Sequence, residues 1–412
     1  MTTHAPLPPS MRLGDTELDS LVAEMAEELG GVQAMAHLFK HVHESRRLPL
    51  ERLRVLKEQN LITQPLIDFF AQRDATPTLS WLDMNEVRTA GEFFRDRGLL
   101  TFSGLAFASL PACYCWSIEA DVLTTTGRLS NTANIPRRIP ETAQLVLDVG
   151  TMDAFEKGGV GITATRKIRL MHALIRYLLI RSPGSVSVDK DKGDMPPWDV
   201  DQCGVPISQE FLLATLLTFH FVILKSLRSM SVLVSEPEQR AYIHRWNLAG
   251  YFLGVNEDML SRVSDYPSCE AELEKMMVAH RRPTQGGELL SQTLIKYTQS
   301  NVIDAVTGGH LHPLTHIPCI LTRYLCGPQT ARCLGLHLDW KDRVLYLPFV
   351  GAVRMVGFLD NFTVFQWLTR RLVAYATKHI WAFAESQGDP SDLAHQRTVS
   401  VPDHLASNWK LR

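Results

Sequence analysis

Apolar residues recur at helical spacing along most of the chain, with polar residues between them. Residues 15–29 begin with Asp15, an acid suited to cap a helix, and stop at Gly30 and Gly31, which suit a helix end. Further amphipathic stretches predict helices over residues 48–58, 62–73, 84–97, 101–127, 137–150, 164–181, 207–231, 236–253, 286–306 and 350–385. Only Gln144–Val149 and Val344–Val350 look like strands, and a helix also fits the first. Because strands do not alternate with helices, the pattern predicts an all-α fold.

The organisation predicted from these stretches is one large helical domain with an N-terminal helical extension. We expect a flexible N-terminus at residues 1–14, the extension at 15–80, the large domain at 81–385 and a polar tail at 386–412. Ser182–Pro197 is polar and rich in Pro and Gly, which predicts a long surface loop. The most apolar stretch, Phe211–Leu224, is shorter than the roughly 20 residues that cross a bilayer. It therefore predicts a buried core helix and no integral membrane span.

Charge and cysteine content narrow the class of protein. The 412 residues contain 42 Lys and Arg against 44 Asp and Glu, for a net charge of -2, so no basic excess favours nucleic acid. Seven scattered cysteines without a CxxC pair are typical of reduced thiols. The first residues contain no basic stretch followed by an apolar run, so we expect no signal peptide and a cytoplasmic location.

A glycine-rich segment, Lys157–Thr163, resembles a phosphate-binding loop. That mechanism needs a lysine just before the final Ser or Thr, and Ile162 occupies this position. The segment therefore predicts a glycine-rich turn that leads into a helix.

Two groups of histidines have spacings found in some metal sites. In the first group, Pro313 interrupts any helix and no acidic residue lies within the cluster, which favours ordinary loop histidines over a zinc site. The members of this group are His310, His312 and His316. His41 and His43, the second group, are predicted to be polar positions on a helix.

The helix predicted over residues 164–181 carries the most chemistry. Its histidine, His172, shares a face with aliphatic side chains three, four and seven positions away. These are Ile168, Ile175 and Leu179. Arg169 and Arg176 flank the imidazole. A core histidine bonded to a backbone carbonyl is the ordinary interpretation. The alternative is an axial ligand to haem iron with arginines near the propionates. Spacing alone leaves both open.

Another helix begins at Arg137–Thr142. Pro140 and Glu141 suit its first turn. Thr142 follows Arg138 by four residues, so both side chains could face one cavity. A solvated basic helix start is the alternative.

Several local patterns occur in a fixed order along the chain. They are Thr126–Leu129, Arg138 with Thr142, Arg169–Arg176, Gly204–Glu210, Tyr242, Trp246 and Gly250–Val255. Taken together they resemble the latex clearing protein (rubber oxygenase) family, whose superfamily includes the oxygenase that cleaves a farnesyl chain in mycophenolic acid biosynthesis. The resemblance covers residues 85–265 well and the C-terminal helices loosely.

The resemblance implies a b-type haem in an all-α fold with a globin-like core. It implies that His172 is the proximal iron ligand and that Arg138 and Thr142 are the distal pair. Two positions depart from the family pattern. Glu141 stands where the rubber-cleaving members have a lysine, and Ser208, a predicted N-cap, stands where the family usually has Asn.

The family's acidic catalytic residue, which precedes Arg138, has no unambiguous counterpart, and Glu119 and Asp121 are the candidates. The resemblance implies a haem-dependent oxygenase that acts with dioxygen on a small apolar unsaturated molecule, for example an isoprenoid. Rubber itself cannot enter a cell. A redox partner is expected if turnover needs electrons. The alternatives are a haem-binding sensor or carrier without turnover, which Glu141 motivates, and a haem-linked dehydrogenase or peroxygenase.

Overall fold

The computed structural model describes residues 7–118, 120, 122, 135–181, 198–299, 317–362 and 364–365, with the backbone alone at residues 99, 135–138 and 140. Within these ranges the regular elements are all helices, and β pairing is limited to an isolated bridge between Trp116 and Arg281. The all-α prediction is confirmed.

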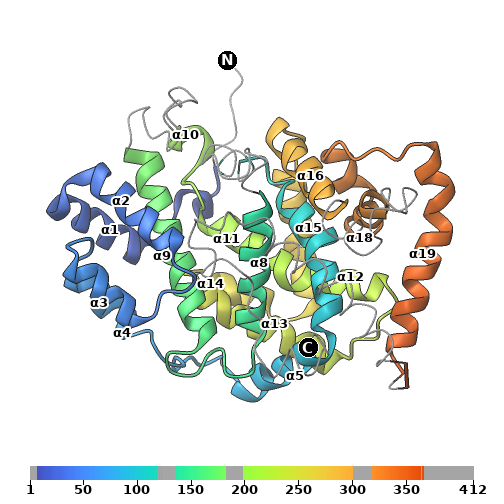
Figure 1. The fold of residues 1–412 in the computed structure, drawn as a ribbon, viewed down its shortest axis with the longest axis horizontal. Coiled ribbons are helices and arrows are strands. Elements are labelled where there is room, and N and C mark those ends of the chain that lie inside the picture. Colours follow the sequence, from blue (N-terminus) through green and yellow to red (C-terminus); the bar gives the residue numbers. More distant parts are fainter. Residues whose placement is uncertain are drawn as a thin grey trace, which may run out of the picture.

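The N-terminal extension consists of four helices, shown in blue in Figure 1. They are α1 (Thr16–Leu29), α2 (Gly31–Glu44), α3 (Leu50–Glu58) and α4 (Gln64–Ala71). The body of the molecule begins with α5 (Met84–Gly104), which continues through a π-helical turn (Leu105–Ser109) into α6 (Leu110–Cys113). The remaining helices are α8 (Ile135–Gly150), α9 (Val160–Arg181), α10 (Val200–Cys203), α11 (Gln209–Leu217), α12 (Ile223–Ser229), α13 (Glu236–Phe252), α14 (Glu257–Leu260), α15 (Tyr266–His280), α16 (Gln285–Thr298), α18 (Ile317–Cys333) and α19 (Trp340–Asp360).

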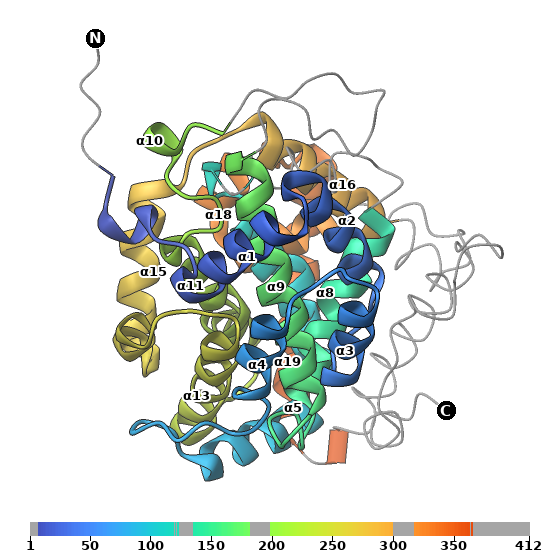
Figure 2. The ribbon, with the colours of Figure 1, turned by 90° about the vertical axis from the view of Figure 1, so that its left-hand side faces the viewer.

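Two hydrophobic clusters meet at α9. One face of α9, with Leu170, Leu174 and Leu178, closes the cluster built by α1–α4. The other cluster fills the body, and Ile175 and Leu179 pack against it from the other side of α9. Figure 2 shows α1 and α2 lying over α9, with the body behind. The sequence pattern predicts a single core, whereas the described residues divide into two clusters that share this helix.

The most apolar stretch of the chain is a helix of the body. Gln209–Ser229 is long and apolar enough to cross a membrane, with a mean hydropathy of 1.6, but 83% of that apolar window is buried inside the protein. The predicted helix over 207–231 is interrupted by a π-helical turn, Thr218–Val222. This burial fits the predicted core helix, because packing inside the protein accounts for its composition.

Three local predictions can be compared with the backbone. The strand at Val344–Val350 is wrong, since these residues lie in α19. There an exposed aliphatic run imitates a strand, while Asp339 and Asp342 cap the helix start reciprocally. Gln144–Val149 is helical, within α8. The glycine-rich turn is confirmed, because Gly158 has a φ of +68° and its N–H donates to a backbone carbonyl, 2.9 Å away, just before α9.

Candidate functional site on helix α9

The central helix α9 has a stripe of side chains that the protein leaves half-buried. Within residues 161–178, Ile168, His172, Ile175 and Tyr177 are half-buried and the others are buried. Ile168, His172 and Ile175 follow one another at spacings of four and three residues, so they share one face of the helix. The opposite face packs on the extension. The imidazole of His172 therefore lies in a partly uncovered aliphatic stripe.

Helix α8 packs beside α9 (Figure 1), and several of its side chains are also half-buried. Ile139, Thr142 and Leu145 are half-buried and recur every three residues, so they share a face. Glu141, also half-buried, precedes Asp148 by seven residues and lies toward the Asp148 side of α8. The threonine and the glutamate thus leave the helix in different directions.

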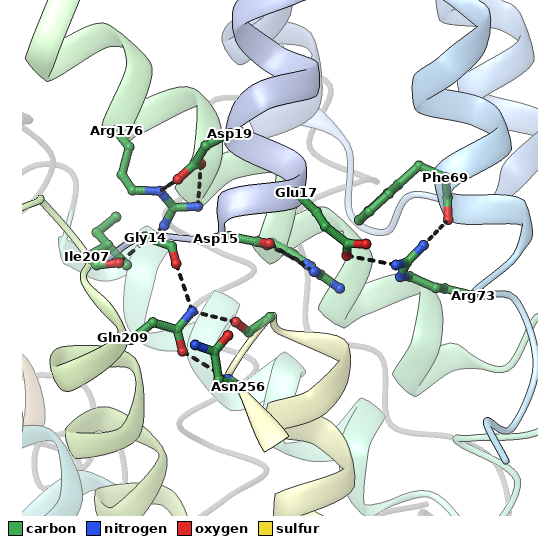
Figure 3. Close-up of polar contacts among 12 residues, drawn as sticks. Gly14, Asp15, Glu17, Asp19, Phe69, Arg73, Arg176, Ile207, Gln209 and Asn256 are labelled. Carbon is green, nitrogen blue, oxygen red and sulfur yellow. Dashed lines mark hydrogen bonds and ion pairs between the residues drawn. The ribbon is translucent and has the colours of Figure 1, made fainter. Parts of the chain in front are cut away.

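Two ion pairs hold α9 against the extension (Figure 3). Arg169 donates to both carboxylate oxygens of Asp15, at 2.5 and 2.9 Å, and both side chains are buried. Two turns further along α9, Arg176 donates to Asp19 at 2.8 Å and to the carbonyl of Ile207 at 3.2 Å. Burial raises the pKa of Asp19, while the neighbouring guanidinium opposes that shift. These pairs fix the position of α9 along its axis, and its rotation about that axis, on both sides of His172.

A buried amide links the same region to the body. Gln209, at the start of α11, donates from Nε2 to the carbonyls of Gly14 and Gly254, at 2.9 and 2.8 Å. Its Oε1 accepts from the backbone N–H of Asn256 at 2.9 Å (Figure 3). Three of the four hydrogen bonds open to a carboxamide are therefore made, all to backbone groups of distant segments.

One glycine of this region has no room for a side chain. Gly254 has a φ of +88°, and a Cβ there would lie 2.5 Å from Oδ2 of Asp15 and 2.8 Å from Nε of Arg169. Both the left-handed backbone and the close approach of the ion pair require glycine.

Helix α8 is also tied to the extension by buried polar contacts. Arg47 donates to both oxygens of Asp148, at 2.7 and 2.5 Å, and Arg46 donates to Gln144 at 2.6 Å. The amide of Gln144 completes the group by donating to Asp148 at 2.5 Å. The segment that joins α2 to α3 thus holds α8, as α1 holds α9.

The far end of α8 is capped from α13. The guanidinium of Arg245 donates to the carbonyls of Val149 and Val87, each at 2.6 Å, and to that of Thr151. Burial lowers the pKa of this arginine to about 9. Carbonyls at a helix C-terminus carry partial negative charge, so a buried cation is favourable here.

The predicted haem-side residues have the following positions. His172 lies on the half-buried stripe of α9. Arg169 and Arg176 are occupied by Asp15 and Asp19, which gives them a structural role, and their predicted contact with propionates stays a prediction.

Several predicted residues fall where the structure gives no side chain. Arg138 is described by its backbone alone, within α8, and Glu119 and Asp121 lie outside the described residues.

Other predicted residues have described side chains. Thr142 and Glu141 are half-buried on α8. Ser208 takes the N-cap position of α11, but its side chain makes no capping hydrogen bond.

Of the two histidine groups, the structure describes only the second. His310, His312 and His316 lie outside the described residues. His41 and His43 lie on α2, as predicted. Among the described residues no three His, Cys, Asp or Glu side chains form a group that could hold a metal ion. A haem iron needs fewer protein ligands, because the porphyrin supplies four nitrogens.

The sequence analysis missed the acidic partners of this site. Asp15 was expected to cap α1, but its side chain makes no capping bond and pairs with an arginine 154 residues away. Asp19 and Asp148 could not be recognised from the sequence. A carboxylate in an amphipathic helix is expected to face solvent unless its partner is known. Gln209 had one signal, its place in the Gly204–Glu210 pattern.

Comparison with known proteins matches the chain to one family. The family described as ER-bound oxygenase mpaB/B'/rubber oxygenase, catalytic domain, matches residues 94–357. Rubber oxygenase from Streptomyces sp. (strain K30) is 26% identical over 266 residues, which cover 62% of this chain and 57% of that protein. The structure of latex clearing protein in the closed state superposes with a TM-score of 0.60 at 18% identity, covering 92% of each chain.

The fold and the site define an all-α protein whose central helix carries an imidazole in an aliphatic stripe and is held by buried ion pairs. The family match extends over more than half of the sequence. The chain belongs to the mpaB and rubber oxygenase family, as the resemblance in the sequence predicted.

Proposed function

We propose that this protein is a haem-dependent oxygenase that uses dioxygen to oxidise a small apolar unsaturated molecule, and that His172 would hold the haem iron. The observation that carries the proposal is the half-buried stripe on α9. An imidazole among aliphatic side chains, at the centre of a helical body and not fully covered by it, fits the proximal side of a haem. The bound haem would supply the capacity to bind and activate dioxygen.

The protein's own residues have three tasks in this proposal. The ion pairs of Arg169 and Arg176 hold α9, and so set the direction of the imidazole. Ile168 and Ile175 exclude water beside it. Thr142, from the neighbouring helix, is proposed to orient dioxygen or substrate through its hydroxyl.

Arg138 and Glu141 complete the proposed set. The arginine would stabilise negative charge as it develops on oxygen. The carboxylate of Glu141 would accept or donate a proton where rubber-cleaving relatives have a lysine. Glu119 stays the proposed additional acid. The curated relative named rubber oxygenase motivates an isoprenoid as the substrate class, and the match spans only 57% of its length.

The test is turnover with labelled oxygen. Haem-loaded protein is mixed with a short isoprenoid under ¹⁸O₂, and carbonyl products are identified by mass spectrometry. Wild-type protein should yield ¹⁸O-labelled aldehyde or ketone, His172→Ala should lose this activity, and His37→Ala, an exposed histidine on α2, should retain it. Absence of product from wild-type protein with bound haem would contradict the oxygenase.

A second candidate is a haem-binding sensor or carrier. Glu141 in place of the distal lysine favours it. In that case the reduced holo-protein would form a stable complex with oxygen and release no product. Glu141→Lys, which restores the family residue, would then leave the product yield at zero.

A further inference from the structure

Helix α19 stands at the outer edge of the molecule, farthest from the extension (Figure 1). Its inner side is fixed to the body at the C-terminal end. Asp360 pairs with Arg97, and Asn361 accepts from the N–H of Leu233 at 2.8 Å and donates to the carbonyl of Ser231 at 2.9 Å. A side chain at Gly357 would collide with the body. The helix is therefore held firmly in one orientation.

The outer side of α19 is apolar over its whole length. Its exposed side chains begin with Trp340, 71% exposed, and continue through Val344 at 67% and Leu347 at 75% to Met355 at 58% and Phe358 at 50%. The ring of Phe362 packs against that of Phe358, with 5.2 Å between the centroids, and Val364 and Phe365 after it are also exposed. A contiguous apolar surface of this kind marks an interaction site. We call these eight side chains the α19 outer face.

The charges on this helix are segregated by sign. Lys341, Arg343 and Arg354 are exposed, although Arg354 donates from Nε to the hydroxyl of Ser231 on the body at 3.1 Å, whereas Asp342 and Asp360 are only 5% and 3% exposed. The neighbouring exposed acid, Asp339, is engaged as the N-cap and accepts from a backbone N–H of the first turn at 2.7 Å. Solvent therefore meets α19 as an apolar surface flanked by positive charge.

We propose that the α19 outer face docks on an anionic lipid surface, with the helix lying in the plane of the headgroups. An apolar face with basic flanks and aromatic residues at both ends is the pattern of interfacial helices. The positive flanks select a negatively charged membrane. A second copy of this chain fits less well, because its α19 has the same exposed positive charges and, apart from the N-cap Asp339, no exposed acid to pair with them. The proposal does not depend on haem or turnover.

The docked helix would lie along the membrane and not across it. The length of α19, 21 residues, corresponds to about 31 Å. The buried inner side, with its acids and its hydrogen bonds to the body, stays with the protein. Only the outer side chains would enter the interface, with Lys341 and Arg343 at headgroup level, while Arg354 keeps its hydrogen bond to Ser231.

The experiment is vesicle flotation of the full chain. Vesicles of phosphatidylcholine are compared with vesicles that contain phosphatidylglycerol, at low and at high salt. We expect wild-type protein to float with the anionic vesicles and at least ten-fold less with the neutral ones, and the bound fraction to fall as salt rises. Brominated lipid should quench fluorescence in wild-type protein more than in Trp340→Phe.

A matched pair of variants tests the location. Val344→Glu lies on the α19 outer face, and Val278→Glu lies on α15 at nearly the same exposure, 69% against 67%. We expect Val344→Glu to reduce flotation at least ten-fold and Val278→Glu to leave it unchanged. Three results would overturn the proposal: wild-type protein that does not float, equal losses in both variants, or a light-scattering mass of a dimer that Val344→Glu returns to a monomer.

Discussion

Replacement of Asp15 by alanine is expected to destabilise the protein far more than replacement of Glu17, two residues along the same helix. Asp15 is 5% exposed and its partner Arg169 is 8% exposed, with N–O distances of 2.5 and 2.9 Å. Without the carboxylate, a buried guanidinium loses its charge partner, at a cost of about 3–5 kcal/mol. This corresponds to a fall of roughly two to three and a half orders of magnitude in the folding equilibrium constant.

Glu17 provides the matched control. It also pairs with an arginine, Arg73, at 2.8 Å, but the carboxylate side chain is 65% exposed. An exposed pair contributes about 0–1 kcal/mol, so Glu17→Ala should be nearly neutral. The difference between the two losses of stability measures the effect of burial, because each change removes one acid from the N-terminal end of α1.

The assay is urea unfolding of the purified chain, followed by tryptophan fluorescence, with midpoints and slopes compared. The double variant Asp15→Leu with Arg169→Met should recover part of the loss, since no unpaired charge remains buried. Equal losses for Asp15→Ala and Glu17→Ala would refute the reasoning. So would a double variant whose loss of stability exceeds the summed losses of its two single variants.

Three further changes have defined outcomes. Gly254→Ala should cost about 1–3 kcal/mol in urea unfolding, because of its positive φ and the ion pair against it, whereas Gly351→Ala on α19, with open space at its Cβ, should not destabilise. Burial lowers the pKa of His220 to about 3, so the unfolded chain binds more protons below pH 6.5 and stability falls by about 2 kcal/mol from pH 7 to 5; His220→Leu should remove this slope, and an unchanged slope contradicts it. Arg245→Met removes three buried hydrogen bonds to backbone carbonyls and should cost about 3 kcal/mol or more, against less than about 1 for Arg240→Met, whose side chain is 57% exposed, and equal costs would contradict the capping role.

The periodic part of the fold was accessible from the sequence. The aliphatic stripe predicts the helix around His172. Ile162, in the place of the lysine that a phosphate-binding loop needs, predicts that the glycine-rich segment before this helix is only a turn. Four of the described α-helices, α10, α14, α15 and α18, lie outside the predicted stretches, and α2 was predicted only through His41 and His43. Pro328 and Gly327 interrupt the pattern of α18, where Gly327 has a non-helical backbone. The strand at Val344–Val350 was predicted wrongly because exposed and buried aliphatic residues look alike in a sequence.

The partners within the site were not accessible. Arg169 and Asp15 are 154 residues apart, and no local pattern joins them. The arginines were assigned to a cofactor because their cationic groups flank His172, and the acids that pair with them became visible only when α1 was seen against α9. Ion pairs between distant residues depend on the tertiary fold, whereas the face of a helix can be predicted from local sequence spacing.

Titration of the apo-protein with haem tests the central proposal most directly. Wild-type protein should bind one equivalent and develop a Soret band with histidine ligation, His172→Ala should lose that spectrum, and added imidazole should restore it to His172→Ala. His37→Ala should match wild-type protein. A Soret band unchanged by the loss of His172, or none in wild-type protein, would contradict the assignment of His172 as the iron ligand.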